Sequence, residues 1–101
     1  MENAREVSRI CRKYGVLMIL DSCRVAENAY FIKHREPGFE NKTYRDIAVE
    51  MFGLCDGTVM SAKKDALVNM GGFIALRDEA LADECKSILI ITEGFSTYGG
   101  L

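Results

Sequence analysis

Two groups of polar residues in this sequence directly follow short apolar runs, where strands would end. The first group comes after the run Val16–Leu20, and its members are Asp21 and Arg24. The second group comes after the run Thr58–Met60, and its members are Ser61, Lys63 and Lys64. In open α/β sheets, ligands bind beyond the carboxyl ends of the strands. If the two runs are neighbouring strands, both groups meet at one crevice and could bind a ligand together.

These residue types meet the requirements of one cofactor, pyridoxal phosphate. This cofactor needs a lysine amine for its covalent link, an acidic partner for its pyridinium nitrogen, and donors for its phosphate. Lys64 could supply the amine, and Asp21 could keep the ring nitrogen protonated. Ser61 and Lys63 could bind phosphate oxygens, as a hydroxyl donor and a point charge. Arg24 could donate to the phenolic oxygen of the ring.

The same residues also have ordinary structural interpretations. A Lys63-Lys64-Asp65 sequence is typical of a solvated turn. An aspartate such as Asp21, at the end of an apolar run, is typical of a helix cap or a turn. Cys23 is interpreted as a small packing residue rather than a nucleophile. Spacing alone therefore leaves both interpretations open.

Short strands alternating with helices must position these residues. The predicted strands are Val16–Leu20, Thr58–Met60 and Phe73–Leu76. The first is continuously apolar, which is typical of a strand buried on both faces of a parallel sheet. The predicted helices cover residues 4–14, 26–35 and 44–52, and a fourth begins after residue 78. This alternation indicates α/β architecture with a mainly parallel sheet flanked by helices.

Local signals predict where several helices begin and end. Asn3 with Glu6, and Thr43 with Asp46, have the spacing of capping boxes. Gly15 is a suitable C-terminal stop. Asp78 could cap the last helix, whose predicted inner face is Leu81, Ala82, Cys85 and Ile88. The run from residue 88 to residue 91 fits either the end of that helix or a strand.

Composition narrows the class of protein. The chain has 101 residues, of which 49% are hydrophobic and 28% charged, as in soluble globular proteins. Thirteen basic and 15 acidic residues give a net charge of −2, without the basic surplus of a nucleic-acid binder. No apolar run approaches the roughly 20 residues that a membrane crossing needs. Four scattered cysteines and no visible signal peptide predict a cytoplasmic protein with reduced thiols.

Three short strands make an incomplete sheet, because buried strands need neighbours on both sides. We therefore expect residues 1–101 to be one part of a larger domain, without an internal boundary.

Three long stretches resemble the aromatic amino acid β-eliminating lyases, the family of tryptophanases and tyrosine phenol-lyases. They are LDSCRVAENAYFIKHREPGFENKT (residues 20–43), MSAKKDALVNMGG (residues 60–72) and EGFSTYGGL (residues 93–101). Their length and order make the resemblance specific, and it extends over essentially the whole chain. The fold it implies is part of the large domain of a fold-type I pyridoxal-phosphate-dependent transferase.

The resemblance implies a role for each residue of the two polar groups. Lys64 matches the lysine that carries the cofactor and acts at the substrate's α-carbon. Asp21 matches the aspartate at the pyridine nitrogen, and Arg24 the arginine near the ring oxygen. Ser61 and Lys63 match phosphate contacts. The reaction implied is α,β-elimination of an aromatic amino acid to give pyruvate, ammonia and a free aromatic ring compound.

Further expectations also come from the resemblance. Asn69 matches a residue whose main-chain carbonyl coordinates a monovalent cation, normally potassium. Phe95 falls where a side chain lines the substrate pocket. SAKKDA is more similar to tryptophanases, whereas LVNMGG and GFENK are more similar to phenol-lyases. We give more weight to SAKKDA, and therefore favour tryptophan over tyrosine as substrate. The implied assembly is a homotetramer built as a dimer of dimers.

Much of the family's catalytic apparatus does not match any residue of this chain. The aromatic residue that stacks on the cofactor and the arginine that binds the substrate carboxylate fall outside the matched stretches. The resemblance therefore predicts that the 101 residues are inactive by themselves and act as part of a longer chain. The alternative from another class is a truncated, inactive remnant.

Overall fold

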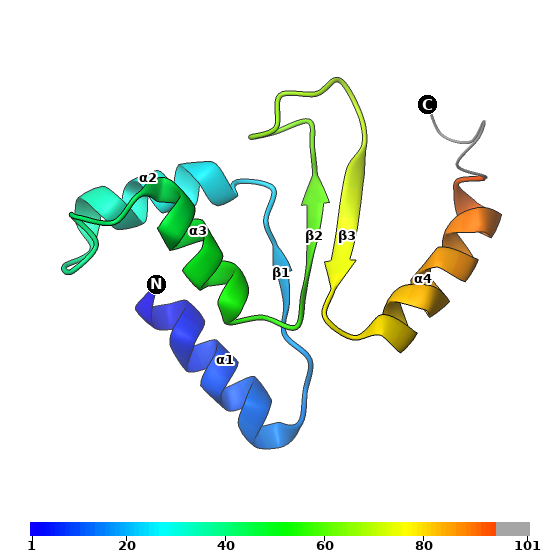
Figure 1. The fold of residues 1–101 in the computed structure, drawn as a ribbon, viewed down its shortest axis with the longest axis horizontal. Helices are drawn as coiled ribbons and strands as arrows, with labels where there is room; N and C mark the ends of the chain where they lie inside the picture. Colours follow the sequence, from blue (N-terminus) through cyan, green and yellow to red (C-terminus); the bar gives the residue numbers. More distant parts are fainter. Residues whose placement is uncertain (95–101) are drawn as a thin grey trace.

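A computed structural model describes residues 1–94 of the chain, which form four helices and one three-stranded sheet (Figure 1). The first helix, α1 (Glu2–Tyr14), ends where the sequence predicts. Gly15 closes it in a left-handed conformation with φ of 64°, which favours glycine. The capping box predicted from Asn3 and Glu6 is wrong, because both residues lie within the helix. Met1 is buried in the core.

The next two helices follow their local sequence signals. Helix α2 (Val25–Arg35) stops before Pro37, which cannot continue a helix. Helix α3 (Tyr44–Gly53) begins with the predicted capping box. The N–H of Asp46 donates to Thr43 Oγ1, and the N–H of Thr43 donates to Asp46 Oδ2, each at 3.1 Å. Two otherwise unpaired donors at the start of α3 are thereby satisfied.

The sheet has the order β1–β2–β3 and mixes both strand directions. Its strands are β1 (Ile19–Asp21), β2 (Gly57–Ser61) and β3 (Gly72–Leu76). β1 runs parallel to β2, but β3 runs antiparallel to it. The predicted mainly parallel sheet is therefore wrong for the β2–β3 pair. Residues 62–71 join these strands without a helix, whereas a parallel return needs a crossover of a dozen residues or more.

The first strand is shorter and more exposed than its apolar sequence predicts. The strand begins at Ile19, and the preceding Val16 and Leu17 are 58% and 56% exposed. Ile19 itself is 43% exposed. Burial on both faces is thus not found, because β1 is an edge strand of the described sheet and pairs only with β2.

The apolar core lies among the first three helices, which gather on one side of β1 in Figure 1. Its buried members are Met1, Ala29, Ile32, Phe39, Ile47 and Met51. Half-buried Leu20 packs against this cluster from β1, so the core fixes the strand that ends at the first polar group. Ile47 and Met51 confirm the predicted apolar stripe of α3, although Tyr44 at its start is 47% exposed.

Helix α4 (Glu79–Thr92) stands apart from this core, beyond β3 (Figure 1). Its predicted cap is confirmed, since Asp78 Oδ1 accepts from the N–H of Leu81 at 2.7 Å. The ambiguous run from residue 88 to residue 91 is helical. Three residues of the predicted inner face are half-buried, namely Leu81, Ala82 and Cys85, but Ile88 is 59% exposed. Within residues 1–94, no helix combines the length and apolar character needed to cross a bilayer.

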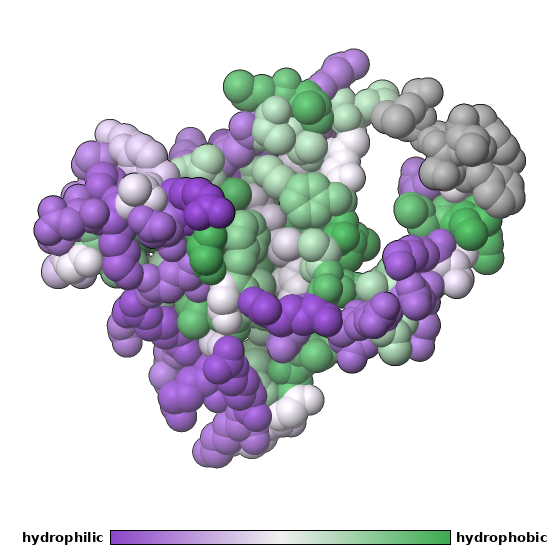
Figure 2. Space-filling model, in the orientation of Figure 1, coloured by the Kyte–Doolittle hydropathy of each residue, from purple (hydrophilic) through white to green (hydrophobic). Residues whose placement is uncertain are grey.

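The chain is open in shape. Its Cα radius of gyration is 15.6 Å, against about 13 Å for a typical domain of 100 residues. In Figure 2, hydrophilic residues dominate over α1, α2 and α3, whereas hydrophobic residues gather over the strands and on α4. The apolar surface of the sheet is therefore only partly covered on the side of α4.

Candidate functional site

Asp21 is the last residue of β1, and its carboxylate is exposed beyond the carboxyl end of the strand. Its Oδ1 accepts a hydrogen bond from the N–H of Cys23 at 3.0 Å. Hydrogen bonds from the thiol and the backbone of Cys23 lower the pKa of the Asp21 carboxyl, and the positive charge of Lys64 lowers it further. Asp21 is therefore an anion at neutral pH, under the influence of a lysine 43 positions along the sequence.

The ends of β1 and β2 lie side by side, as the sequence predicts for the two polar groups. The strands are parallel neighbours, and Asp21 pairs in register with Val59. Ser61, half-buried at the end of β2, donates its N–H to Cys23 Sγ at 3.0 Å. Cys23 therefore touches both groups, through its backbone to Asp21 and through its sulfur to Ser61.

Two buried hydroxyl groups link the ends of β1 and β2. Ser22 and Thr58 are 1% and 6% exposed, and their hydroxyl oxygens are 2.7 Å apart. Thr58 Oγ1 also lies 2.8 Å from the carbonyl oxygen of Leu20, and the N–H of Ser22 donates to Val59 at 2.9 Å. A buried polar group that keeps its partners holds its neighbours in one arrangement.

The turn that carries Lys63 and Lys64 is attached to the start of α2. Both lysine side chains are exposed, but the following Asp65 is half-buried. Asp65 Oδ2 accepts hydrogen bonds from the backbone N–H groups of Ala26 at 2.9 Å and Glu27 at 3.1 Å. The turn is thereby attached beside the end of β1, while both lysine side chains remain in solvent, as the interpretation as a solvated turn also expects.

Arg24 is placed differently from the other members of the two groups. It occupies the N-cap position of α2, and its guanidinium forms an ion pair with Glu27 on the same helix at 3.1 Å. The Arg24 side chain is thus directed along α2. The structure brings together Asp21, Ser61 and the Lys64 turn, whereas the guanidinium of Arg24 is engaged outside that group.

An apolar groove extends from this group of residues toward α4. Its volume is about 710 Å³, and Asp21, Cys23 and Ser61 line its polar end. The rest of its wall is mainly apolar, with residues such as Val59, Met60, Phe73, Ile74, Leu76 and Leu89. A planar aromatic group could lie along this wall while polar atoms bind at the end of β1 and β2.

Comparison with known proteins assigns the sequence of this chain to a family. The family model for beta-eliminating lyases matches residues 1–100. This chain belongs to the beta-eliminating lyase family. The tryptophanase of Salinibacter ruber is 54% identical to it over the whole chain, which covers 21% of that relative. The tyrosine phenol-lyase of Symbiobacterium thermophilum is 48% identical over the whole chain, which covers 22% of that relative.

Family membership confirms the resemblance of the three long stretches. A probable beta-eliminating lyase of Trichomonas vaginalis is also 54% identical over the whole chain. Because relatives with the names tryptophanase and tyrosine phenol-lyase match at similar identity, membership in the beta-eliminating lyases does not fix the substrate. The chain spans about a fifth of the length of the curated relatives it matches.

Two predicted site residues of this family member lie apart from the group at the strand ends. Asn69 is exposed in the loop between β2 and β3, in the same connection as Lys64. Its expected role toward a cation remains a prediction. Phe95, the predicted residue of the substrate pocket, lies outside the described residues.

The sequence interpretation missed the residues that hold the site together. Asp65 was assigned only to a polar turn, and Ser22 had no role. One signal was present, because Arg24 at the N-cap of α2 cannot accept hydrogen bonds from the free N–H groups of the first turn. That signal requires an acceptor from another part of the chain, but it does not identify Asp65.

Proposed function

We propose that this chain supplies the cofactor-binding lysine region of a pyridoxal-phosphate-dependent lyase that eliminates the aromatic side chain of an amino acid. One observation carries the proposal. The parallel β1–β2 pair brings Asp21 beside Ser61, and a hydrogen bond from Asp65 to Cys23 holds the turn that carries Lys64 next to them, in a member of the beta-eliminating lyases. The activity belongs to a longer protein that contains this region.

The side chains present fit the cofactor. Asp21 is ionised at neutral pH, as a partner for a pyridinium nitrogen must be. Lys64 offers an exposed amine, and Ser61 and Lys63 offer a hydroxyl and an ammonium group to phosphate oxygens. When bound, pyridoxal phosphate supplies an electron sink for negative charge at the substrate's α-carbon.

Each residue then has a defined task. With the cofactor bound, Lys64 Nζ would hold it covalently and would also act as the general base for the substrate's α-proton. Asp21 would hold the proton on the ring nitrogen. Ser61 and Lys63 would orient the phosphate. Arg24 would donate to the ring oxygen through N–H groups other than those on the Nη1 that pairs with Glu27.

We favour tryptophan over tyrosine as the substrate. The SAKKDA stretch supports this choice, and the apolar groove beside Ser61 offers room for an indole ring. The products would be indole, pyruvate and ammonia. Tyrosine, with release of phenol, is the second candidate, because LVNMGG and GFENK resemble the phenol-lyases and relatives of that name are 46–48% identical.

We also propose that the main-chain carbonyl of Asn69 is one ligand of potassium or another monovalent cation. Asn69 lies in the same loop as Lys64, so a cation there would stiffen the connection that carries the lysine. The whole enzyme would be a cytoplasmic homotetramer. The four cysteines, which are free thiols in the structure, agree with a reducing compartment.

The 101 residues alone are not expected to catalyse the reaction. The groove is open, no residue of α4 is buried, and only Ser61 and Lys63 remain for the phosphate. The isolated chain should bind pyridoxal phosphate weakly, form no pyruvate from tryptophan or tyrosine, and aggregate through its exposed strand edges. Steady pyruvate production by the isolated chain would contradict this expectation.

A hybrid protein tests the proposal. This chain replaces the matching 101 residues of the Salinibacter ruber tryptophanase, and pyruvate is measured with tryptophan and with tyrosine. We expect elimination of tryptophan, and loss by at least about 10²-fold in Lys64→Ala. Lys13→Ala, an exposed lysine on α1, is the matched control and should retain full activity. Turnover by Lys64→Ala at the control rate would overturn the proposal.

A further inference from the structure

Helix α2 begins without a cap from its own sequence. The residue at its N-cap is Arg24, whose side chain makes no capping hydrogen bond. The first N–H groups of a helix have no acceptor within the helix, and a missing acceptor there is costly. The start of α2 therefore depends on an acceptor supplied from elsewhere in the chain.

Asp65 supplies that acceptor from 38 and 39 residues away. Its Oδ2 receives the N–H groups of Ala26 at 2.9 Å and Glu27 at 3.1 Å. In return, the N–H of Asp65 donates to the carbonyl oxygen of Cys23 at 3.3 Å. A carboxylate at the N-terminus of a helix also gains from the helix dipole. Three hydrogen bonds thus join the turn after β2 to the turn after β1.

This connection fixes the backbone of the neighbouring Lys64. Asp65, the residue directly after Lys64, is anchored, and the Lys64 carbonyl accepts from the N–H of Leu67 at 3.0 Å, which closes the turn around Asp65. The Lys64 side chain is exposed, so its place beside Asp21 follows from where its backbone is held. Without the anchor, the turn could move away from the end of β1.

We propose that Asp65 is a positioning residue for Lys64: by capping α2 across the fold, it holds the lysine turn against the end of β1, where Asp21 and Ser61 lie. The proposal rests on the proposed function, because it gives Lys64 the task of binding the cofactor. It assigns to Asp65 a role that goes beyond helix stability.

The anchor itself is tested without any cofactor. Amide hydrogen exchange is measured at Ala26 and Glu27 in the hybrid protein before any cofactor is added. Asp65→Ala should speed exchange at both amides by about tenfold, as loss of a cap does. Asp65→Asn keeps an acceptor oxygen but loses the charge, so an intermediate increase of about threefold is expected. The matched control is Asp78→Ala, which removes the cap of α4 and should leave both amides unchanged.

The effect on Lys64 is measured in the hybrid protein. Pyridoxal phosphate is added, the link is trapped with borohydride, and peptide mapping gives the ratio of label on Lys64 to label on Lys63. Asp65→Ala should lower this ratio by about tenfold and Asp65→Asn by about threefold, whereas Asp78→Ala, equally a lost cap, should leave it unchanged. If circular dichroism shows that Asp65→Ala does not fold, the labelling ratio of Asp65→Asn is used to test the proposal.

The possible failures are distinguishable. Faster exchange at Ala26 and Glu27 with an unchanged labelling ratio would overturn the inference, since Asp65 would then only cap α2. An equal drop of the ratio in Asp78→Ala would also overturn it. No preference for Lys64 in the unmutated hybrid would instead overturn the proposed function, and this inference with it.

Discussion

Residues 1–61 and residues 72–94 differ in how far they bury their own apolar side chains. All the buried apolar side chains of the described chain lie between Met1 and Cys55. From residue 72 to residue 94, which form β3 and α4, no residue is buried. The first part closes a core of its own, whereas the second part lines an open groove. Asp21, Ser61 and the Lys64 turn lie where the two parts meet.

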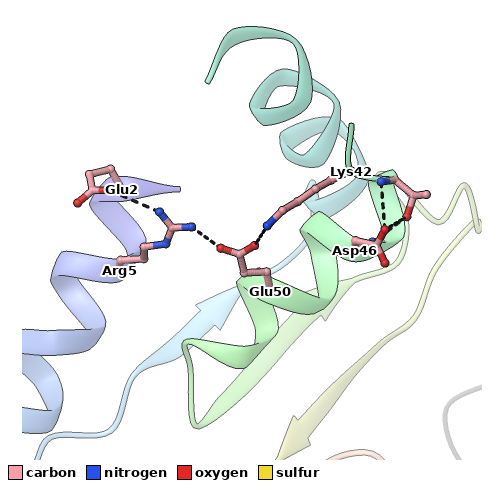
Figure 3. A network of polar contacts seen from close by, with 6 residues as sticks. Glu2, Arg5, Lys42, Asp46 and Glu50 are labelled. Carbon is pink, nitrogen blue, oxygen red and sulfur yellow. Dashed lines mark hydrogen bonds and ion pairs between the residues drawn. The ribbon is translucent and has the colours of Figure 1, made fainter. Parts of the chain in front are cut away.

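The two parts also differ in the polar contacts that join their helices to other elements. In the first part, the Glu50 carboxylate of α3 accepts hydrogen bonds from Arg5 of α1 and from Lys42 Nζ (Figure 3). Helices far apart in sequence are thus joined by charge as well as by the core. The ion pair of α4, between Asp83 and Lys86, stays within the helix. A stable site therefore requires that the first part hold its position and that further contacts close the groove.

The largest effect is expected for the elimination rate when Asp21, where the two parts meet, is changed. Asp21→Asn in the hybrid protein should lower the elimination rate by at least about 10²-fold while some cofactor stays bound. A neutral amide cannot hold a proton on the pyridine nitrogen, so the electron sink is lost. Pyruvate formation and bound cofactor are measured together. Asp83→Asn, an exposed aspartate of α4, is the matched control and should keep normal turnover; near-normal turnover in Asp21→Asn would refute the role.

The next largest effect is expected for the free energy of unfolding when a side chain of each part is shortened. Ile47 is 0% exposed and Ile91 is 85% exposed. Ile47→Ala should lower the free energy of unfolding by about 3 kcal/mol, because it leaves a cavity in the core. Ile91→Ala should change it by less than about 0.5 kcal/mol. Urea unfolding of the hybrid protein, which is used for every stability measurement below, gives both values when followed by circular dichroism. Equal losses would contradict the assignment of the core to the first part.

Features set by neighbours in sequence could be predicted from the sequence. The capping box of Thr43 and Asp46, the cap by Asp78 and the left-handed Gly15 each depend on residues within four positions. The failed capping box at Asn3 shows the limit of such signals. There, the helix already includes Asn3, so its side chain does not cap it.

Features set by distant partners could be predicted only in part. The meeting of Asp21 with the Lys64 turn was predictable, because parallel neighbouring strands present their ends at one edge. The anchor of Asp65 on α2 was not, since its partners lie 38 and 39 residues away and no local pattern marks the pair. The direction of β3 also escaped prediction, because an apolar run carries no information about the direction in which it pairs.

A smaller effect on the free energy of unfolding is expected from the ion pairs of Glu50, which join α1 to α3. Hydrogen bonds from Lys42 and then Arg5 lower the pKa of the Glu50 carboxyl from its ordinary value of 4.5. The ionised carboxylate therefore stabilises the fold above that value, and this contribution is lost as the pH falls through 4.5 toward the pKa of the folded chain. Glu50→Gln should lower the free energy of unfolding by about 1 kcal/mol at neutral pH.

The pH dependence provides the check on Glu50. The difference between the unmutated chain and Glu50→Gln should disappear on acidification, as measured by urea unfolding at several pH values. The matched control is Asp83→Asn, which removes an exposed ion pair within α4 and should cost less at every pH. A difference for Glu50→Gln that grows on acidification would contradict the assigned direction of the pKa shift.

The smallest effect is expected in the loop that joins the two parts. Leu67 has φ of 57°, in the left-handed region that disfavours residues with a Cβ, and its side chain is 88% exposed. Leu67→Gly should relieve this strain without loss of packing and, after the entropy cost of glycine, raise the free energy of unfolding by about 0.5 kcal/mol. Val68→Gly, at an exposed neighbour without positive φ, should lower it instead. Equal losses in both variants would show that the left-handed turn after Lys64 does not form in solution.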